Sequence, residues 1–276
     1  MTQTDSITTP DGLHLYTRTW LPPNTPDAYV VLIHGYGDHS GRYDQFARLL
    51  TDASLGMYSY DQRGFGLSDG RRGYIARFDT LLADLDIFMH HNEADFHQRP
   101  VFLLGQSLGG LIVIRYAQTR QPSLSGLVLC SPLLSFSENV PKMLLALGPY
   151  VAAIAPWMPV SSVDPKGFSH APEVVKAAEN DPLNYHGKVH ARTGAEMQRA
   201  VASALADAAN VTLPVFVAHG SADRVVPPSG TERFFEVCAA PDKTLRLFEN
   251  GYHELWHDLD EETLAREISA WLRQRL

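Results

Sequence analysis

Apolar residues recur along this chain as short continuous runs, each followed by a stretch in which apolar positions stand three or four residues apart. The first run is AYVVLIHG at 28–35, and the amphipathic stretch YDQFARLLTDA follows at 43–53. A continuous apolar run predicts a strand buried on both faces of a sheet. The amphipathic stretch predicts a helix that covers one of those faces.

The same pair of patterns repeats through most of the sequence. Further strands are expected at 54–61, 101–107, 124–132, 213–220 and 244–250, and further helices at 78–94, 109–120, 231–240 and 262–274. Before the first run, two alternating segments flank the turn at 10–12, Pro-Asp-Gly, which is typical of a hairpin. Strands that alternate with helices predict an α/β fold with a mostly parallel sheet flanked by helices.

This alternation stops between residues 133 and 208, where the sequence is rich in Pro, Ala and other apolar residues. A loop of that length without structure of its own is uncommon in a compact domain. We therefore expect a core in two parts, 1–132 and 209–276, with a helical cap or lid inserted at 133–208. An ordinary pair of helices packed on the sheet is the alternative.

The segment 143–160 within this insertion is an uncharged apolar run of 18 residues, at the lower limit for a membrane-spanning helix. Prolines at 149, 156 and 159 interrupt it. A helix broken so often leaves backbone groups that lipid does not satisfy. The segment is therefore predicted to form short helices of the cap.

Two motifs point to different chemistries. GQSLG at 105–109 matches the pattern around a serine nucleophile, and HELWH at 253–257 matches the H-E-x-x-H pattern of zinc peptidases. Ser107 lies between a predicted strand and a predicted helix, as a nucleophile elbow requires. His253 follows the turn signal Asn250-Gly251, so we expect it in a loop and not inside the helix that a zinc site needs. A second G-x-S-x-G, at 66–70, is followed by charged residues instead of an apolar helix.

Serine chemistry also needs an acid and a histidine. In hydrolases of this type the nucleophile, the acid and the histidine follow one another along the chain, each at the carboxyl end of a strand. Asp223 is the only carboxylate in the loop after the strand at 213–220, and His253 follows the next strand. The predicted catalytic residues are Ser107, Asp223 and His253. The predicted oxyanion hole consists of the backbone N–H groups of Leu108 and Tyr36.

Composition narrows the expected partners. The chain has 276 residues, 45% of them apolar, and a formal net charge of −8 with both signs interspersed, so nucleic acid is not an expected partner. The polar amino terminus lacks the pattern of a signal peptide, which predicts a cytoplasmic location. Cys130 and Cys238 have no metal-like spacing and are expected to be free thiols. Neither a cofactor nor a metal ion is expected.

Taken together, these motifs resemble the monoglyceride lipases of the α/β-hydrolase superfamily. The resemblance covers about residues 10–275 and is carried by HGYGDHSGRY at 34–43, DQRGFGLSDG at 61–70, GQSLGG at 105–110, DPL at 181–183, HGSADRVV at 219–226 and KTLRLFENGYHEL at 243–255. Bacterial lysophospholipases and general esterases share most of these motifs. The resemblance implies an α/β-hydrolase fold with an inserted cap and a carboxylic ester hydrolase whose triad is Ser107, Asp223 and His253.

The resemblance also implies a small lipid ester, such as a monoacylglycerol, as the substrate. It implies an apolar cap that makes transient contact with a membrane or micelle surface and admits the acyl chain. The expected substrate contacts are Leu144, Leu145, Leu147 and Ile154 in the cap, with Asp38 and Arg42 at the polar head. Alternatively, Asp38 and Arg42 form an ion pair that stabilises the loop. The family's second histidine after the catalytic one falls near Trp256 in this chain.

Three other functions remain open at this point. A short-chain carboxylesterase or a lysophospholipase would use the same triad on a different ester. A zinc metallopeptidase would use HELWH, with activity that a strong chelator removes. A binding protein that keeps the fold without turnover is disfavoured, because nucleophile, acid and base are all present in order.

Overall fold

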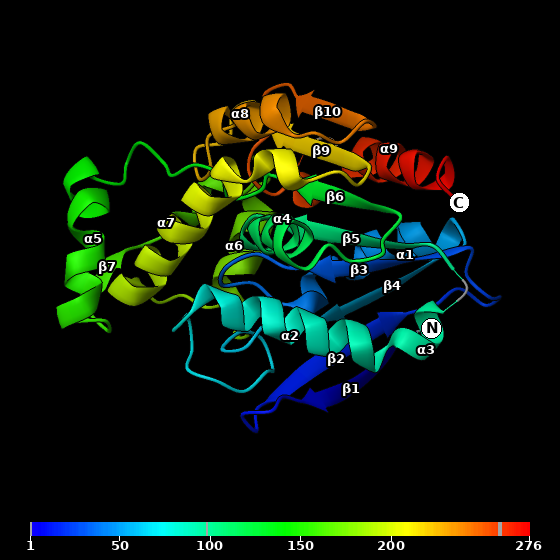
Figure 1. Ribbon diagram of the computed structural model, residues 1–276, viewed down its shortest axis with the longest axis horizontal. Helices are drawn as coiled ribbons and strands as arrows, with labels where there is room; N and C mark the ends of the chain where they lie inside the picture. The colour runs from blue at the N-terminus through cyan, green and yellow to red at the C-terminus, as the bar shows by residue number, and fades with distance from the viewer. Residues whose placement is uncertain (1, 98, 259–260) are drawn as a thin grey trace.

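The structure is a computed structural model that describes residues 2–97, 99–258 and 261–276. Its centre is a sheet with the strand order β1-β2-β4-β3-β5-β6-β9-β10 (Figure 1). The strands are β1 Thr2–Thr8, β2 His14–Trp20, β3 Ala28–Ile33, β4 Leu55–Tyr60, β5 Val101–Gln106, β6 Gly126–Cys130, β9 Val215–Gly220 and β10 Lys243–Phe248. The pairs β1–β2 and β2–β4 are antiparallel and the others are parallel. The predicted mostly parallel sheet is confirmed.

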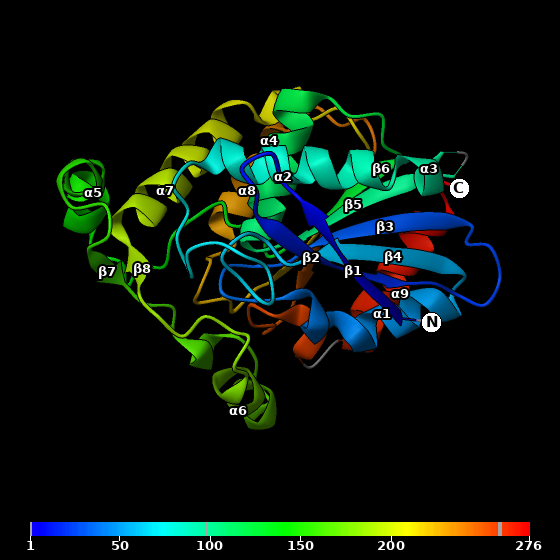
Figure 2. The same cartoon turned by 90° about the horizontal axis from the view of Figure 1, so that it is seen from below.

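Helices cover both faces of the sheet. Figure 2 shows α1 Asp44–Asp52 and α9 Glu261–Arg273 on one face, and α2 Phe78–His91 and α4 Leu108–Arg120 on the other. Helix α8 Ser229–Val237 packs on the same side as α2 and α4, and α3 Glu93–Phe96 is a single turn after α2. Within β3, Val30 and Leu32 pack toward α1 and α9, while Val31 and Ile33 pack toward α4. This alternation explains the continuous apolar run, because both faces of the strand are buried.

The chain leaves the sheet after β6 and returns at β9. In between it forms α5 Lys142–Ile154, β7 Pro159–Ser161, α6 Pro172–Asn180, β8 Val189–His190 and α7 Ala191–Ala206. Figure 1 shows α5 and β7 at the end of the molecule opposite both termini. Helix α7 differs from α5, because the part of it from Met197 onward packs into the core through Met197, Ala200, Val201 and Ala204. The carboxyl-terminal end of α7 is thus part of the core, and its amino-terminal end packs against α5.

Residues 143–160 differ from the short helices that their prolines predict. Most of the segment forms the single helix α5, with Pro149 inside it. Pro156 follows the helix, and Pro159 begins β7, where it pairs with β8. In the part of the chain that the structure describes, no helix is long and apolar enough to cross a membrane.

Candidate active site

Four loops at one edge of the sheet carry the predicted catalytic residues. They follow β3, β5, β9 and β10, which are parallel where they pair and therefore end at the same edge. The loop after β3 carries Tyr36, β5 runs into Ser107, and the other two loops carry Asp223 and His253. The fold thus brings together residues that lie up to 217 positions apart in the sequence.

Ser107 occupies a sharp turn between β5 and α4. Its backbone has φ 53° and ψ −115°, a region that residues other than glycine rarely enter. Such a conformation costs on the order of 1–3 kcal/mol and persists because neighbouring contacts hold it. The Ser107 N–H donates to the Cys130 carbonyl at 3.0 Å, and the Ser107 carbonyl accepts from the Leu133 N–H at 2.9 Å. The turn therefore presents the hydroxyl as a nucleophile elbow does.

Glycines next to Ser107 let backbone segments approach closely. A Cβ atom at Gly109 would collide with the carbonyls of Ile33 and His34, and one at Gly105 would collide with the backbone of Gly109. At Gly110 a Cβ would lie 2.8 Å from the side chain of Pro132. The three glycines of GQSLGG are thus explained, because a larger side chain at any of these positions would collide with a neighbouring segment.

Asp223 and His253 form a short, buried hydrogen bond. The Nδ1 atom of His253 lies 2.6 Å from Oδ2 of Asp223, and each residue has 4% of its surface exposed. The other carboxylate oxygen, Oδ1, accepts from the N–H groups of Val225 and Val226 at 2.8 and 2.9 Å. The carboxylate is therefore fixed before it meets the imidazole. Since Nδ1 faces Asp223, the Nε2 atom of His253 is the one available to a substrate or a nucleophile.

Burial and charge act in opposite directions on this pair. Burial on its own raises the pKa of Asp223, but the neighbouring His253 and the hydrogen bonds from His219 and His253 lower it well below its ordinary value. Burial likewise lowers the pKa of His253, yet the charge of Asp223 and its hydrogen bond raise that pKa above its ordinary value. The pair thus favours a carboxylate beside a basic imidazole, which is the state that a general base needs.

Two residues that the sequence did not single out as catalytic support the triad. His219 is fully buried, and its Nε2 lies 3.2 Å from Oδ2 of Asp223 and 2.8 Å from the Val226 carbonyl. Gln106 donates from Nε2 to the carbonyl of His253 at 3.1 Å. The first contact holds the acid, and the second ties the histidine loop to the residue before the nucleophile. The sequence carries no signal for the second contact, because the two residues are far apart along the chain.

The predicted oxyanion donors lie beside Ser107. Leu108 is the first residue of α4, and the N–H groups at the start of a helix have no acceptor within the helix. A Cβ at Gly35 would lie 3.4 Å from Cβ of Ser107, so the loop that carries Tyr36 packs directly against the nucleophile. The Tyr36 hydroxyl donates to the Gly73 carbonyl at 2.8 Å, which holds its ring against the loop. This geometry is compatible with both backbone donors.

The HELWH motif is used for an ion-pair network. Glu254 accepts two hydrogen bonds from Arg42, at 2.9 and 2.6 Å, and its Oε2 lies 3.1 Å from Nδ1 of His257. The Nε2 of His257 lies 3.1 Å from the Arg42 carbonyl, so both ring nitrogens of His257 have protein partners. His253 lies in a loop and only His257 lies in a short 3-10 helix, Leu255–His257. The expectation that HELWH is not helical at His253 is confirmed.

Asp38 and Arg42, predicted to contact the polar head of the substrate, form the ion pair that was the alternative, with Arg42 Nη1 at 3.2 Å from Asp38 Oδ1. Asp38 also accepts from the hydroxyl of Tyr43 at 2.7 Å and lines the cavity beside Ser107. Arg42 instead lies between Asp38 and Glu254. The network therefore joins the loop after β3 to the loop that carries His253. Trp256 is 1% exposed and packs against Tyr43 and Phe46, inside the core.

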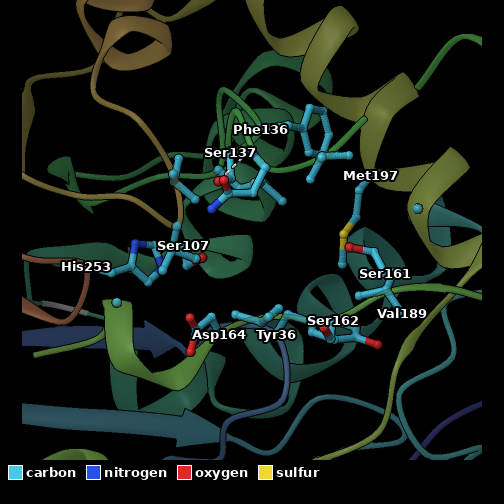
Figure 3. A pocket seen from close by; sticks show the side chains of 18 of the residues that line it. Tyr36, Ser107, Phe136, Ser137, Ser161, Ser162, Asp164, Val189, Met197 and His253 are labelled. Carbon is cyan, nitrogen blue, oxygen red and sulfur yellow. Dashed lines mark hydrogen bonds between the residues drawn. The ribbon is translucent and has the colours of Figure 1, made fainter. Parts of the chain in front are cut away.

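Ser107 and His253 open into one cavity of about 400 Å³. Figure 3 shows both at one end of it, with Val189 and Met197 toward the other end. Apolar side chains from the cap segment 133–208 form much of its wall, among them Leu133, Phe136, Leu144, Leu145, Val160 and Met197. Leu147 and Ile154 do not line it and have 49% and 83% of their surface exposed. Of the four predicted cap contacts, α5 thus directs Leu144 and Leu145 inward and the other two outward.

The family model described as serine aminopeptidase, S33, matches residues 24–260. The chain belongs to this hydrolase family.

Several members are similar over nearly their whole length. A monoglyceride lipase of Rattus norvegicus is 32% identical over 96% of this chain and 89% of its own. A monoacylglycerol lipase of Mycolicibacterium smegmatis is 30% identical over 96% of this chain and 95% of its own. The Paleococcus ferrophilus monoacylglycerol lipase, whose crystal structure is known, is 35% identical to this chain in sequence. The two structures match with a TM-score of 0.87, over 95% of this chain and 99% of the other. The family and the α/β-hydrolase fold implied by the sequence motifs are confirmed.

Proposed function

We propose that this protein is a serine ester hydrolase that cleaves monoacylglycerols, or similar lipid monoesters, through an acyl-enzyme intermediate. The observation that carries the proposal is the contact of 2.6 Å between His253 and Asp223, together with an apolar cavity that both His253 and Ser107 line. A triad in an apolar cavity fits an ester with a long hydrocarbon chain. The relatives named monoglyceride and monoacylglycerol lipase support the same substrate class.

The reaction follows from the positions of the side chains. His253 removes the proton of the Ser107 hydroxyl as its oxygen attacks the ester carbonyl, while Asp223 holds the imidazole in the required tautomer. The N–H groups of Tyr36 and Leu108 stabilise the developing oxyanion. The imidazolium then gives its proton to the leaving alcohol, and an acyl ester remains on Ser107. Water attacks this ester with His253 again as base, which releases the fatty acid and restores the serine.

The cap segment supplies the acyl site in this proposal. Leu144 and Leu145 from α5, together with Val160 and Met197, would contact the hydrocarbon chain. At the opposite end, Asp38 lines the cavity near the reacting bond and would contact the alcohol. Arg42 holds Asp38 and Glu254 in place and contributes to that end through them. Residues 133–208 thus act as the cap, and the two flanking parts act as the hydrolase core.

The outer face of α5 supports contact with a lipid surface. Met143, Leu147, Tyr150 and Ile154 are exposed, and their spacing of four, three and four residues places them on one side of the helix. Trp157 and Met158, just beyond the helix, are exposed as well. Apolar side chains gathered in this way are favourable at a membrane or micelle surface. A cytoplasmic location with reversible contact with such a surface belongs to this proposal.

A substrate panel tests the proposed function. Purified protein would be given 1-monoacylglycerols and p-nitrophenyl esters with acyl chains from acetyl to palmitoyl, a lysophospholipid, and a peptide amide. We expect the highest kcat/KM on a monoacylglycerol with a medium or long chain. A preference for acetyl esters or for the lysophospholipid would contradict the substrate assignment. Retained hydrolysis by Ser107→Ala would contradict the mechanism.

A further inference from the structure

Helix α5 contains a backbone defect in the wall of the acyl cavity. Pro149 lies inside the helix and has no N–H group. In a regular α-helix the N–H at this position would donate to the carbonyl four residues earlier, which is that of Leu145. The Leu145 carbonyl therefore lacks the donor that a regular α-helix would give it. A carbonyl left without a donor in a partly buried position costs free energy comparable to a lost hydrogen bond.

A side chain from the neighbouring helix supplies the missing donor. The Nε2 atom of Gln198, in α7, donates to the Leu145 carbonyl at 3.0 Å. Gln198, Leu145 and Gly148 all line the cavity, and a Cβ at Gly148 would lie 3.8 Å from Oε1 of Gln198. The amide of Gln198 thus occupies the place where α5 and α7 meet at the cavity wall. Figures 1 and 2 show the two helices side by side.

The apolar contacts around this bond are small. α5 and α7 are joined by a cluster in which Ala152 packs with Ala191 and Ala195, with Val151 and Val160 at its margin. Alanine side chains bury little area, and the outer side of α5 is exposed. Just beyond α5, the N–H groups of Ala191 and Arg192 at the start of α7 donate to the carbonyls of Met158 and Pro156. Within α5 itself, the bond from Gln198 adds a directional contact to these small apolar ones. The other end of α7 is fixed in the core, so α5 is the wall that yields when the bond is lost.

We propose that Gln198 is a specificity-determining positioning residue: by bonding the carbonyl that Pro149 frees, it holds α5 in place and fixes the acyl side of the cavity. The substrate half of this proposal rests on the proposed function. A long acyl chain reaches Leu144 and Leu145 and gains from a closed wall. A butyryl chain stays near Ser107 and gains little. When the closed wall is less populated, the apparent KM for long chains rises in proportion, while kcat on the bound ester is unaffected.

The test removes the donor and then restores it from the backbone. Gln198→Met keeps an unbranched side chain of similar length but cannot donate. Loss of one net hydrogen bond should raise KM for a lauroyl ester about fivefold relative to a butyryl ester. In the double variant Gln198→Met with Pro149→Ala, the new N–H at position 149 can donate to the Leu145 carbonyl. The lauroyl-to-butyryl KM ratio should then return to within about twofold of the wild-type ratio.

Gln118→Met is the matched control. The Nε2 of Gln118 donates to the Ala204 carbonyl at 2.8 Å, which is also a glutamine-to-helix bond that involves α7, but it lies away from the cavity. This variant should lower thermal stability without changing the ratio of KM values. Pro149→Ala should not restore its stability. Comparing Gln198→Met with Gln118→Met separates the effect of losing the bond to Leu145 from the effect of losing any glutamine hydrogen bond to a helix.

A second readout does not depend on hydrolysis. Thermolysin should cut within residues 142–160 about fivefold faster in Gln198→Met than in wild type, and Pro149→Ala should reverse the increase. The proposal would be overturned if the double variant restored neither the KM ratio nor the cleavage rate, or restored only one of them. If the wild type hydrolyses no long-chain ester, the proposed function fails, and the cleavage rates alone then decide whether Gln198 holds α5.

Discussion

The two sides of the cavity are built differently. On the core side, Asp223 has partners for both carboxylate oxygens, and the loop of His253 is tied to Gln106. On the opposite side, α5 packs on α7 through small side chains and accepts a hydrogen bond from Gln198, and two backbone bonds join the segment after α5 to the start of α7. The difference indicates that Asp223 and His253 are held firmly by several hydrogen bonds, whereas α5 is held by fewer and smaller contacts. Chemistry and substrate choice should therefore respond to different mutations.

The sharpest contrast should come from the triad itself. Ser107→Ala or Asp223→Asn should lower kcat/KM about 10⁴-fold or more on butyryl and lauroyl esters alike. Both variants should keep the circular dichroism spectrum of the wild type, because neither removes a large apolar side chain. A loss confined to one chain length would contradict the assignment of these residues to the chemistry.

The ion pair between Arg42 and Glu254 tests the rigidity of the core side. Glu254→Leu removes the bidentate partner of the largely buried Arg42 guanidinium and should destabilise the protein by about 3 kcal/mol in urea unfolding. The double variant Arg42→Met with Glu254→Leu should recover part of this loss, because it removes the buried guanidinium that Glu254→Leu leaves without its bidentate partner. Asp38 then keeps its hydrogen bonds from the Tyr43 hydroxyl and the His39 N–H. An additive double variant would show that the two side chains do not stabilise one another.

The exposed stripe on α5 tests the cap side. Leu147→Glu combined with Ile154→Glu should weaken binding to phosphatidylcholine vesicles about tenfold, because two apolar anchors are replaced by charges. Hydrolysis of a dissolved butyryl ester should change little, since neither residue lines the cavity. Val237→Glu is the control, because Val237 is 56% exposed but lies in α8. Equal losses for both variants would argue against docking through the cap.

The smallest expected effect concerns pH. Asp223 raises the pKa of His253 above its ordinary value of 6.5. His253 must be neutral to act as a base, so kcat/KM should be lost as pH falls through this raised pKa. The acid limb of the profile should therefore have its midpoint above about 6.5. A midpoint well below that value would mean that Asp223 does not stabilise the imidazolium.

The same division between core and cap separates what the sequence predicted from what it did not. Continuous apolar runs identified the buried strands, and chain order placed Asp223 and His253 at the ends of β9 and β10. Those patterns are local, because each depends on one strand and the loop after it. The core and the contact between Asp223 and His253 were therefore accessible from residues alone.

The cap was less accessible for a physical reason. Three prolines predicted short helices, but α5 continues through Pro149, and Gln198 donates to the Leu145 carbonyl, which Pro149 cannot reach with an N–H. Leu147 and Ile154 were predicted to contact substrate, and only the orientation of α5 reveals that they face solvent. Glu254 was considered for zinc, whereas its partner is Arg42, 212 residues away. Contacts between distant segments decide all three cases, and no local pattern encodes them.

Labelling with a fluorophosphonate, followed by mass spectrometry of the peptides, tests the central claim most directly. Ser107 is predicted to carry the adduct, because its hydroxyl is activated by His253 and opens into the cavity. Ser68, in the second G-x-S-x-G, is predicted to stay unmodified, since its hydroxyl donates to the Asp61 carbonyl and accepts from the Tyr16 N–H. An adduct on any other residue, or ester hydrolysis that persists with Ser107 unlabelled, would contradict the account.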